Sequence, residues 1–273
     1  MPELPEVEVL RRSLAPRLEG RRVEGVEVRE SRLREPVSRR ALDRLCGSEF
    51  AALRRRAKYL LADLTGGRTL VVHLGMSGRL SLLPGERQRG AHEHVVLALS
   101  GDEELVFRDP RRFGLIVVLP TDELTTDRRF VHLGLEPLDE TFDGDRLAAL
   151  ARGRRGPVKN FLMNGRLVVG VGNIYASEAL FRAGIHPRRS VARIAPRRWR
   201  RLAAAVQSVL AGAIEQGGTT LNDFEDAVGQ AGYFQVSLEV YGRRGEPCKR
   251  CGRPVRRLVQ AGRSTFYCPG CQR

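Results

Sequence analysis

The first half of the chain alternates short apolar runs with turn residues. Runs typical of β-strands lie at residues 23–28, 59–64, 69–74, 94–99, 104–107 and 115–119. Glycine- and proline-containing pairs at 66–67, 84–85 and 100–101 separate several of these runs and indicate turns. Several antiparallel strands at this spacing predict a β-sandwich or a β-barrel.

Helical periodicity is found at the N-terminus and again in the second half. Pro5 suits the first turn of a helix whose apolar residues recur every three to four positions, and Pro16 is expected to disturb that helix. Residues 136–156 are predicted to form a connector followed by a helix, and further helices are predicted at 173–183 and 196–216. The pattern predicts a β-rich N-terminal domain and a helical C-terminal domain that ends in a small appendix.

The charge of the chain is strongly positive and unevenly distributed. Its 273 residues carry a formal net charge of +15, and residues 136–273 hold 23 basic but only 12 acidic side chains. Such an excess favours a polyanionic partner, and nucleic acid is the first candidate. Only three of the 47 basic residues are lysine, namely Lys58, Lys159 and Lys249. Because the chain otherwise uses arginine, each lysine is a candidate for a specific chemical role.

Targeting signals are missing from the sequence. The longest purely apolar run, residues 115–119, is far shorter than the roughly 20 residues that span a bilayer. The N-terminus carries Glu3, Glu6 and Glu8 and lacks the basic and apolar pattern of a signal peptide. We therefore expect a cytoplasmic protein without a membrane segment.

Two close cysteine pairs stand in the C-terminal appendix: Cys248, Cys251, Cys268 and Cys271. Sixteen residues separate the pairs, which is the spacing of a four-thiolate zinc site. A segment of about 26 residues cannot bury enough apolar surface to fold without such a staple. We predict one structural Zn²⁺, with strands at 255–259 and 265–267 joined by a basic turn at 260–263. Cys46 is left over and is expected to be a buried structural thiol.

Two further segments are candidates for chemistry on a nucleic acid. The glycine-rich run 170–175 precedes a predicted helix, and backbone amides at a helix N-terminus can bind a phosphate. Removal of Met1 would expose Pro2 as a secondary amine, which can attack a sugar C1′ and form an iminium. The positive end of the following helix favours the neutral amine, and Glu3 lies within reach as a general acid or base. An ordinary tight turn and a frayed chain end are the alternatives for these two segments.

Distinctive sequence blocks run along the whole chain. They are Met-Pro-Glu-Leu-Pro-Glu-Val-Glu at 1–8, Arg-Arg-Ala-Lys-Tyr-Leu-Leu at 55–61, His-Leu-Gly-Met-Ser-Gly at 73–78, Asp-Pro-Arg-Arg-Phe-Gly at 109–114, Val-Val-Gly-Val-Gly-Asn-Ile-Tyr-Ala at 168–176, Glu-Gln-Gly-Gly-Thr-Thr-Leu at 215–221 and the closing cysteine hairpin. In content and order they resemble the bacterial formamidopyrimidine-DNA glycosylases, from the first residue to the last.

The resemblance implies an α+β multidomain fold. Residues 1–135 would form an N-terminal β-sandwich catalytic domain, 136–235 a linker and a helix-two-turn-helix domain, and 236–273 a four-cysteine zinc β-hairpin. The implied activity is that of a bifunctional DNA glycosylase and abasic-site lyase. It would excise 8-oxoguanine and formamidopyrimidines from double-stranded DNA through an N-terminal proline Schiff base followed by β,δ-elimination. A monomer associated with the nucleoid through DNA is expected.

The same resemblance assigns roles at the reacting sugar and its phosphates. Pro2 is the implied nucleophile, Glu3 the general acid/base and Glu6 a supporting acid. Lys58 matches a catalytic-loop lysine that contacts a phosphate beside the lesion. Three residues are similar to the phosphate contacts that pinch and bend the DNA: His73, Asn173 and Arg263.

Other positions correspond to residues near the extruded base. Met76, Arg111 and Phe113 resemble the side chains that fill the gap in the duplex, with Arg111 facing the orphaned cytosine. Lys159 stands where the family has a basic residue near the damaged base. Ordinary core packing is the alternative for Met76 and Phe113. Residues 217–234, which hold the lesion-capping loop in the family, have no strong local signal, and no base-reading residue is assigned there.

Two alternative functions stay open at this point. The endonuclease VIII branch shares the proline nucleophile and prefers oxidised pyrimidines, although its members usually have glycine where this chain has Leu4. A non-catalytic DNA-binding zinc protein is the second alternative, and it would need no free Pro2 amine.

Overall fold

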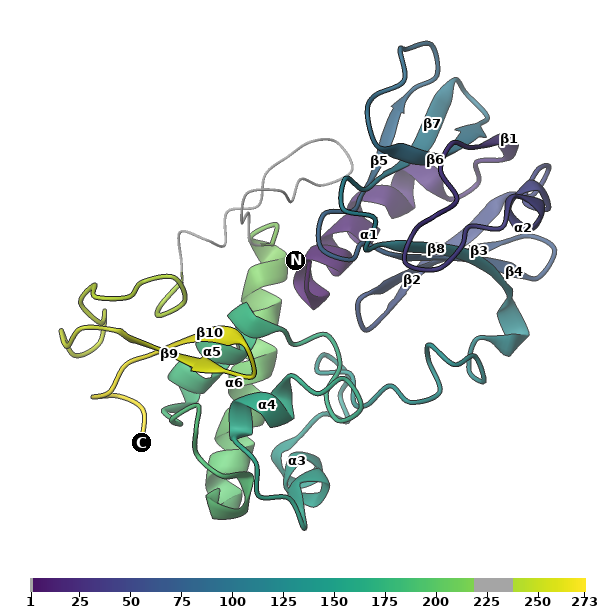
Figure 1. The fold of residues 1–273 in the computed structure, drawn as a ribbon. Helices are drawn as coiled ribbons and strands as arrows, with labels where there is room; N and C mark the ends of the chain where they lie inside the picture. Colours follow the sequence, from purple (N-terminus) through teal and green to yellow (C-terminus); the bar gives the residue numbers. More distant parts are fainter. Residues whose placement is uncertain (1, 219–237) are drawn as a thin grey trace. The chain divides into compact units, whose positions relative to one another are not determined.

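The computed structural model describes residues 2–218 and 238–273, which fall mainly into two compact units (Figure 1). The first comprises residues 2–131, and the second comprises 132–216 together with 238–273. Most of the segment 217–234, and the expected boundary between 235 and 236, lie outside the described residues. No helix in the described part of the chain is long and apolar enough to cross a membrane.

The first unit opens with helix α1 (Leu4–Leu18). Its start is capped, because the Glu6 carboxylate accepts a hydrogen bond of 2.7 Å from the Glu3 backbone N–H. The helix continues through Pro16, so the expectation of a disturbance there was wrong. Pro16 lies in the last turn and removes only one backbone bond, whereas Leu14 and Leu18 on either side of it are fully buried.

Eight strands form two antiparallel four-stranded sheets in this unit. One sheet has the order β1 (Val23–Val28), β6 (Glu93–Leu99), β7 (Glu103–Arg108) and β5 (Arg79–Pro84). The other has the order β2 (Phe50–Arg56), β3 (Tyr59–Leu64), β4 (Arg68–His73) and β8 (Leu115–Pro120). Apolar side chains of both sheets and of α1 share one core cluster. The predicted β-sandwich is confirmed.

The sequence pattern did not predict several short elements of the first unit. Strands β2 and β5, helix α2 (Arg39–Asp43) and the 3₁₀ turn η1 (Thr121–Glu123) were not predicted. In β2 only Phe50 and Leu53 are buried, and its end is a run of three arginines. Cys46, which follows α2, is exposed and not buried as expected, because Leu42 and Leu45 occupy the buried positions of that segment.

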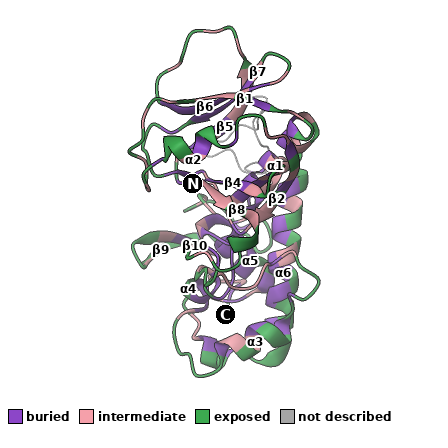
Figure 2. Ribbon diagram, turned by 90° about the vertical axis from the view of Figure 1, so that its right-hand side faces the viewer, coloured by how far each residue is buried: buried purple, intermediate pink, exposed green. Residues whose placement is uncertain are grey.

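Helices dominate the second unit. They are α3 (Gly144–Ala151), α4 (Val158–Leu162), α5 (Asn173–Ala183), the 3₁₀ turn η2 (Val191–Arg193) and α6 (Pro196–Glu215). The bounds predicted for α5 are confirmed, and the end of α6 differs by one residue. Nearly all of α5 is buried, whereas α6 buries one face and exposes the other (Figure 2).

A two-stranded hairpin, β9 (Arg256–Gln260) and β10 (Arg263–Tyr267), completes the second unit. Ala261 and Gly262 form its turn with φ angles of 47° and 72°. Two successive positive φ angles match the right-handed twist of the flanking strands. The hairpin predicted between the cysteine pairs is therefore present, and its tip presents Arg263.

Candidate functional site

Strand register brings several candidate residues to one end of the sheet β2-β3-β4-β8. Tyr59 at the start of β3 pairs with His73 at the end of β4, and His73 also pairs with Leu115 at the start of β8. Lys58 precedes β3, residues 74–78 follow β4, and residues 109–114 precede β8. Three blocks that are far apart in the sequence therefore meet at this sheet end.

Lys58 lies in a two-residue turn between β2 and β3. The preceding Ala57 has a φ of 55°, in the left-handed region that such turns usually fill with glycine. The Arg55 guanidinium donates to the Ala57 carbonyl at 3.0 Å and to Glu8 of α1 at 3.3 Å. Burial would raise the pKa of Glu8, but Arg11, Arg55 and Arg12 together lower it. The lysine turn is thus tied to helix α1, which begins directly after Glu3.

The N-terminal candidates lie directly before and within the first turn of α1. Pro2 is half-buried, whereas the side chains of Glu3 and Glu6 are 2% and 3% exposed. Glu6 fixes the backbone of Glu3 through the capping bond, and Glu3 follows Pro2 directly. Pro2 and the buried acid Glu3 are thus successive residues at the positive end of a 15-residue helix. A nucleophilic amine and a proton donor can both act from this position.

His73 is held as a neutral imidazole. Burial, together with the positive charges of Arg34 and Lys58, lowers the pKa of His73 from 6.5 to about 4. Its Nδ1 accepts a hydrogen bond of 2.9 Å from the Gly75 backbone N–H. The proton of the neutral ring therefore lies on Nε2. His73 offers a phosphate one neutral N–H donor and no positive charge.

Met76, Arg111 and Phe113 project from the two loops at the same sheet end. Met76 is 40% exposed and Phe113 47%, so core packing does not account for these apolar side chains. The Arg111 guanidinium lies 4.9 Å from the centre of the Phe113 ring. Exposed apolar side chains beside a stacked arginine are suited to insertion between bases.

In the second unit, Asn173 and Lys159 meet the hairpin. Asn173 is the first residue of α5, and its Nδ2 donates to the Ser264 carbonyl at 2.9 Å and to the Tyr241 hydroxyl at 3.3 Å. Lys159 is only 1% exposed, and its ammonium donates to Asn173 Oδ1 at 2.5 Å and to Thr265 Oγ1 at 2.7 Å. Lys159 thus cross-links α4, the start of α5 and strand β10.

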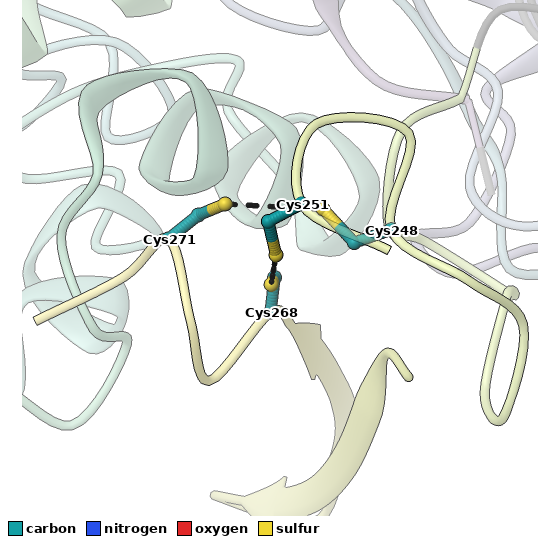
Figure 3. A group of neighbouring side chains, drawn as sticks. All are labelled: Cys248, Cys251, Cys268 and Cys271. Carbon is teal, nitrogen blue, oxygen red and sulfur yellow. Dashed lines mark hydrogen bonds between the residues drawn. The ribbon is translucent and has the colours of Figure 1, made fainter. Parts of the chain in front are cut away.

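The four cysteines of the zinc prediction face one another (Figure 3). Their sulfur atoms all lie within 4.8 Å of one another, with Cys251 and Cys268 3.4 Å apart and Cys248 and Cys271 3.9 Å apart. Tetrahedral thiolates around one Zn²⁺ lie about 3.8 Å apart. The cluster fits one structural zinc ion, because four thiolates leave no open coordination position.

The zinc module packs on α5. Cys248 and Cys268 share an apolar cluster with Phe181 of α5, and the Arg250 guanidinium lies 4.3 Å from the centre of the Phe181 ring. Buried Gln272 accepts from the Cys268 backbone N–H and donates to the Ile185 carbonyl. These contacts hold the hairpin, and hence Arg263, against the helix that Asn173 begins.

Two residues of this region were missed by sequence reasoning. Tyr241 contacts Asn173, and the buried Glu178 of α5 accepts three backbone N–H bonds of 2.8–3.0 Å from residues 239–241. Burial raises the pKa of Glu178 although these three bonds act to lower it. An acidic residue inside an otherwise apolar helix was the available signal for Glu178. Nothing in the local sequence pointed to Tyr241.

Comparisons with known proteins agree with this geometry. Three family models match: the formamidopyrimidine-DNA glycosylase N-terminal domain at 1–116, its H2TH domain at 133–225, and a zinc finger found in these enzymes and in isoleucyl-tRNA synthetases at 245–273. A formamidopyrimidine-DNA glycosylase from Alkalilimnicola ehrlichii is 54% identical, and the match covers 100% of both chains.

Solved structures of Lactococcus lactis enzymes are also similar over the full length. A mutant enzyme bound to DNA containing Fapy-dG has a TM-score of 0.93 at 32% identity and 100% coverage of both chains. The wild-type enzyme bound to DNA containing an oxidised pyrimidine has a TM-score of 0.91 at 33% identity, again with 100% coverage of both chains. This chain therefore belongs to the formamidopyrimidine-DNA glycosylase family.

Proposed function

We propose that this chain excises oxidised purines, such as 8-oxoguanine and formamidopyrimidines, from double-stranded DNA and then cleaves the strand at the abasic site. The observation that carries the proposal is the pair Pro2 and Glu3 at the capped start of α1. Family membership supports a DNA glycosylase. A DNA-binding zinc protein without activity would have no use for a free Pro2 amine.

The chemistry follows from these two groups. The Pro2 nitrogen attacks C1′ of the damaged nucleotide, the N–C1′ bond forms, and the glycosidic bond breaks as Glu3 donates a proton toward the sugar. The departing base takes up the proton that the Pro2 nitrogen loses, and the sugar ring opens to an iminium on Pro2. The iminium acidifies the proton at C2′, so its removal expels the 3′ phosphate. A second elimination expels the 5′ phosphate, and water releases Pro2.

The remaining candidates act on the DNA. A base within a duplex is out of reach, and extruding it costs a few kcal/mol. Met76, Arg111 and Phe113 would occupy the vacated space, with Arg111 facing the orphaned cytosine. Lys58, His73, Asn173 and Arg263 would hold phosphates on either side, which stabilises the bent duplex. Buried Lys159 would act by holding Asn173 and the hairpin in place.

Zinc takes no part in the reaction. When bound, Zn²⁺ stabilises the cysteine module and thereby fixes the hairpin that carries Arg263. We further propose the division into a catalytic domain at 1–135, a linker with the H2TH domain at 136–235 and a zinc hairpin at 236–273. Action on chromosomal DNA would place the protein at the bacterial nucleoid.

Borohydride trapping tests the nucleophile. Reduction during turnover on an 8-oxoguanine duplex should yield a covalent protein–DNA adduct whose modified peptide begins at Pro2. A variant that retains an extra N-terminal residue should bind the duplex but form no adduct, because its Pro2 nitrogen is an amide. Full cleavage by that variant would exclude Pro2 as the nucleophile.

The same assay defines the substrate class. Duplexes carrying 8-oxoguanine, a formamidopyrimidine or an oxidised pyrimidine should be compared side by side, since the Lactococcus relative has been solved with each of the last two kinds of lesion. We expect faster excision of the purine lesions. Faster excision of the oxidised pyrimidine would instead favour an endonuclease VIII-like specificity.

A further inference from the structure

The two loops that carry Met76, Arg111 and Phe113 touch through their backbones. Gly75, with a φ of 62°, packs against the other loop so closely that a Cβ added there would lie 2.4 Å from the Phe113 carbonyl carbon. Gly114 is equally confined, because an added Cβ would lie 3.0 Å from both Asp109 Oδ2 and the His73 carbonyl oxygen. The loop at 74–78 and the loop at 109–114 are therefore packed tightly against each other.

The buried side chain of Asp109 connects the two loops through hydrogen bonds. Its side chain is completely buried, and its Oδ1 accepts a hydrogen bond of 2.6 Å from Ser77 Oγ of the other loop. Its Oδ2 accepts from the Gly114 backbone N–H at 2.7 Å, and Oδ1 also accepts from the Arg111 backbone N–H at 3.3 Å. The Asp109 carbonyl accepts from His94 Nε2 at 2.7 Å, which ties the loop to strand β6.

The bonded atoms lie next to the exposed side chains. Ser77 directly follows Met76, Gly114 directly follows Phe113, and the Arg111 N–H belongs to Arg111 itself. A buried carboxylate is costly unless its oxygens are satisfied, and here the donors come from both loops. If the contact between the two loops served only stability, apolar side chains at this place would be sufficient. The carboxylate instead fixes the relative positions of the three side chains.

We propose that Asp109, acting with Ser77, is a positioning residue that makes Met76, Arg111 and Phe113 enter the duplex as one preformed wedge. The proposal rests on the proposed function, in which these side chains fill the space of the extruded nucleotide. Because the wedge is ordered before DNA binds, insertion does not have to order two separate loops.

Asp109→Asn is the first test variant. An asparagine has one acceptor oxygen in place of two, so if that oxygen accepts from the Gly114 N–H, the amide NH₂ faces the Arg111 N–H, which is also a donor. We expect excision of 8-oxoguanine opposite cytosine, at saturating enzyme, to slow by about tenfold or more, the loss typical of one charge-assisted hydrogen bond. Ser77→Ala should slow it in the same direction, because Asp109 loses the donor from the other loop and keeps only the Arg111 and Gly114 N–H groups. Ser77→Thr, which keeps the hydroxyl, should restore it.

Glu104→Gln is the matched control. Glu104 is also a buried carboxylate of the same sandwich, on strand β7, and it accepts from Arg89 at 2.8 Å, outside both loops. Its loss should lower the melting temperature but leave the rate of excision at saturating enzyme unchanged. If it slows excision as much as Asp109→Asn does, general destabilisation explains both effects and the proposal fails.

The decisive readout is the dependence on the opposite position. When the lesion faces an abasic analogue there is no pair to break and no orphaned base for Arg111 to face, so the defects of Asp109→Asn and Ser77→Ala should be clearly smaller than on the cytosine duplex. An equal defect on both duplexes, or a wild-type rate on the cytosine duplex, overturns the proposal.

A reporter that needs no bond cleavage separates this idea from the proposed function. In a duplex with a tetrahydrofuran abasic analogue and 2-aminopurine in the opposite strand, wild-type binding should raise fluorescence as the stack opens. Asp109→Asn should bind with a smaller rise, and an equal rise contradicts the wedge role. Wild-type failure to form a borohydride adduct would refute the Pro2 chemistry while this reporter still tests Asp109.

Discussion

Lysine and arginine differ in this chain in a way that the structure explains at the level of single side chains. Lys159 fits its compact ammonium between Asn173 and Thr265 in a fully buried space. A planar guanidinium is larger than an ammonium and would not fit the same acceptors and volume. Lys249, by contrast, is exposed and donates to the Leu238 carbonyl at 3.0 Å. Only one of these two lysines is held in an environment that excludes arginine.

Lys159→Arg should therefore be destabilising, by about 1–3 kcal/mol, because it overpacks a closed site. It should also weaken binding to an abasic-analogue duplex, since Asn173 and the hairpin would shift. Urea denaturation and fluorescence anisotropy measure the two effects. Lys249→Arg is the matched control and should change stability by less than about 0.5 kcal/mol. Equal effects of the two variants would show that Lys159 has no special environment.

His73 should make stability depend on pH in a defined window. Its folded-state pKa of about 4 lies below the ordinary 6.5, so the unfolded chain takes up the proton first. The contribution of the neutral ring is complete above pH 6.5 and is lost as the pH falls toward 4. His73→Asn keeps an acceptor for the Gly75 N–H but does not titrate. Urea denaturation at pH 7, 5.5 and 4.5 should show a shallower acid-side loss for this variant, and parallel losses would contradict the pKa shift.

The part of the predicted site that the structure confirms at the residue scale is the four-cysteine cluster. The cysteine spacing was sufficient for the metal site, because ligand spacing is a local property. The environments of Lys159 and Cys46 could not be predicted in this way. Burial of Lys159 depends on Ser264 and Thr265, about 105 residues further along the chain. The exposure of Cys46 depends on which neighbouring leucines reach the core.

Among the secondary-structure elements, α5 links the phosphate candidates to the zinc module. Asn173 begins the helix, Glu178 in its middle holds residues 239–241, and Phe181 near its end packs on Cys248 and Cys268. One face of an 11-residue helix thus carries three contacts to the C-terminal segment.

Glu178→Gln should loosen this link. The amide has a single acceptor oxygen and cannot accept from all three backbone N–H groups, so we expect a loss of about 2–3 kcal/mol in unfolding free energy. Chemical denaturation measures the loss, and a colorimetric zinc assay checks that the metal stays bound. Asp145→Asn on α3 removes an exposed ion pair with Arg200 of α6 and should cost at most about 1 kcal/mol. Equal costs would mean that Glu178 is not a structural anchor.

The elements that sequence periodicity predicted well are the long or strongly apolar ones. Strand β2 was missed because its alternation is carried by alanine and arginine, and helix α4 because five residues show no helical period. The continuation of α1 through Pro16 was also missed, since it depends on the burial of Leu18 against the sandwich. In each case tertiary packing overrode the local pattern.

For the whole molecule, zinc removal should have a local effect. The module at 245–273 and the end of α5 share an apolar cluster that contains two of the cysteines, whereas the sandwich has a core of its own. Chelation should therefore expose the C-terminal segment to limited proteolysis and abolish DNA binding, and fragments of residues 2–131 should stay protease-resistant. Digestion of the sandwich at the same rate would show that the two units unfold together.

The salt dependence of DNA binding should separate the charged phosphate contacts from the neutral ones. Arg263→Ala should lower the slope of log K against log salt by about 1, because one cation no longer displaces a counterion. His73→Asn should weaken binding at every salt concentration but leave the slope nearly unchanged, since the imidazole is neutral. Anisotropy titrations between low and moderate salt measure both slopes. A reduced slope for the His73 variant would require a charged ring in the complex.

The pairing of Tyr59 with His73 and of His73 with Leu115 limits how this protein can change in length. Substitutions in β4 or β8 alter packing at one position, but a single-residue deletion in either strand shifts every following side chain to the opposite face. Such a deletion would move the loop at 74–78 away from the loop at 109–114 even if the sandwich still folded. Insertions and deletions should therefore be tolerated at the distal turns, such as Gly66-Gly67 between β3 and β4, and not between those turns and the site.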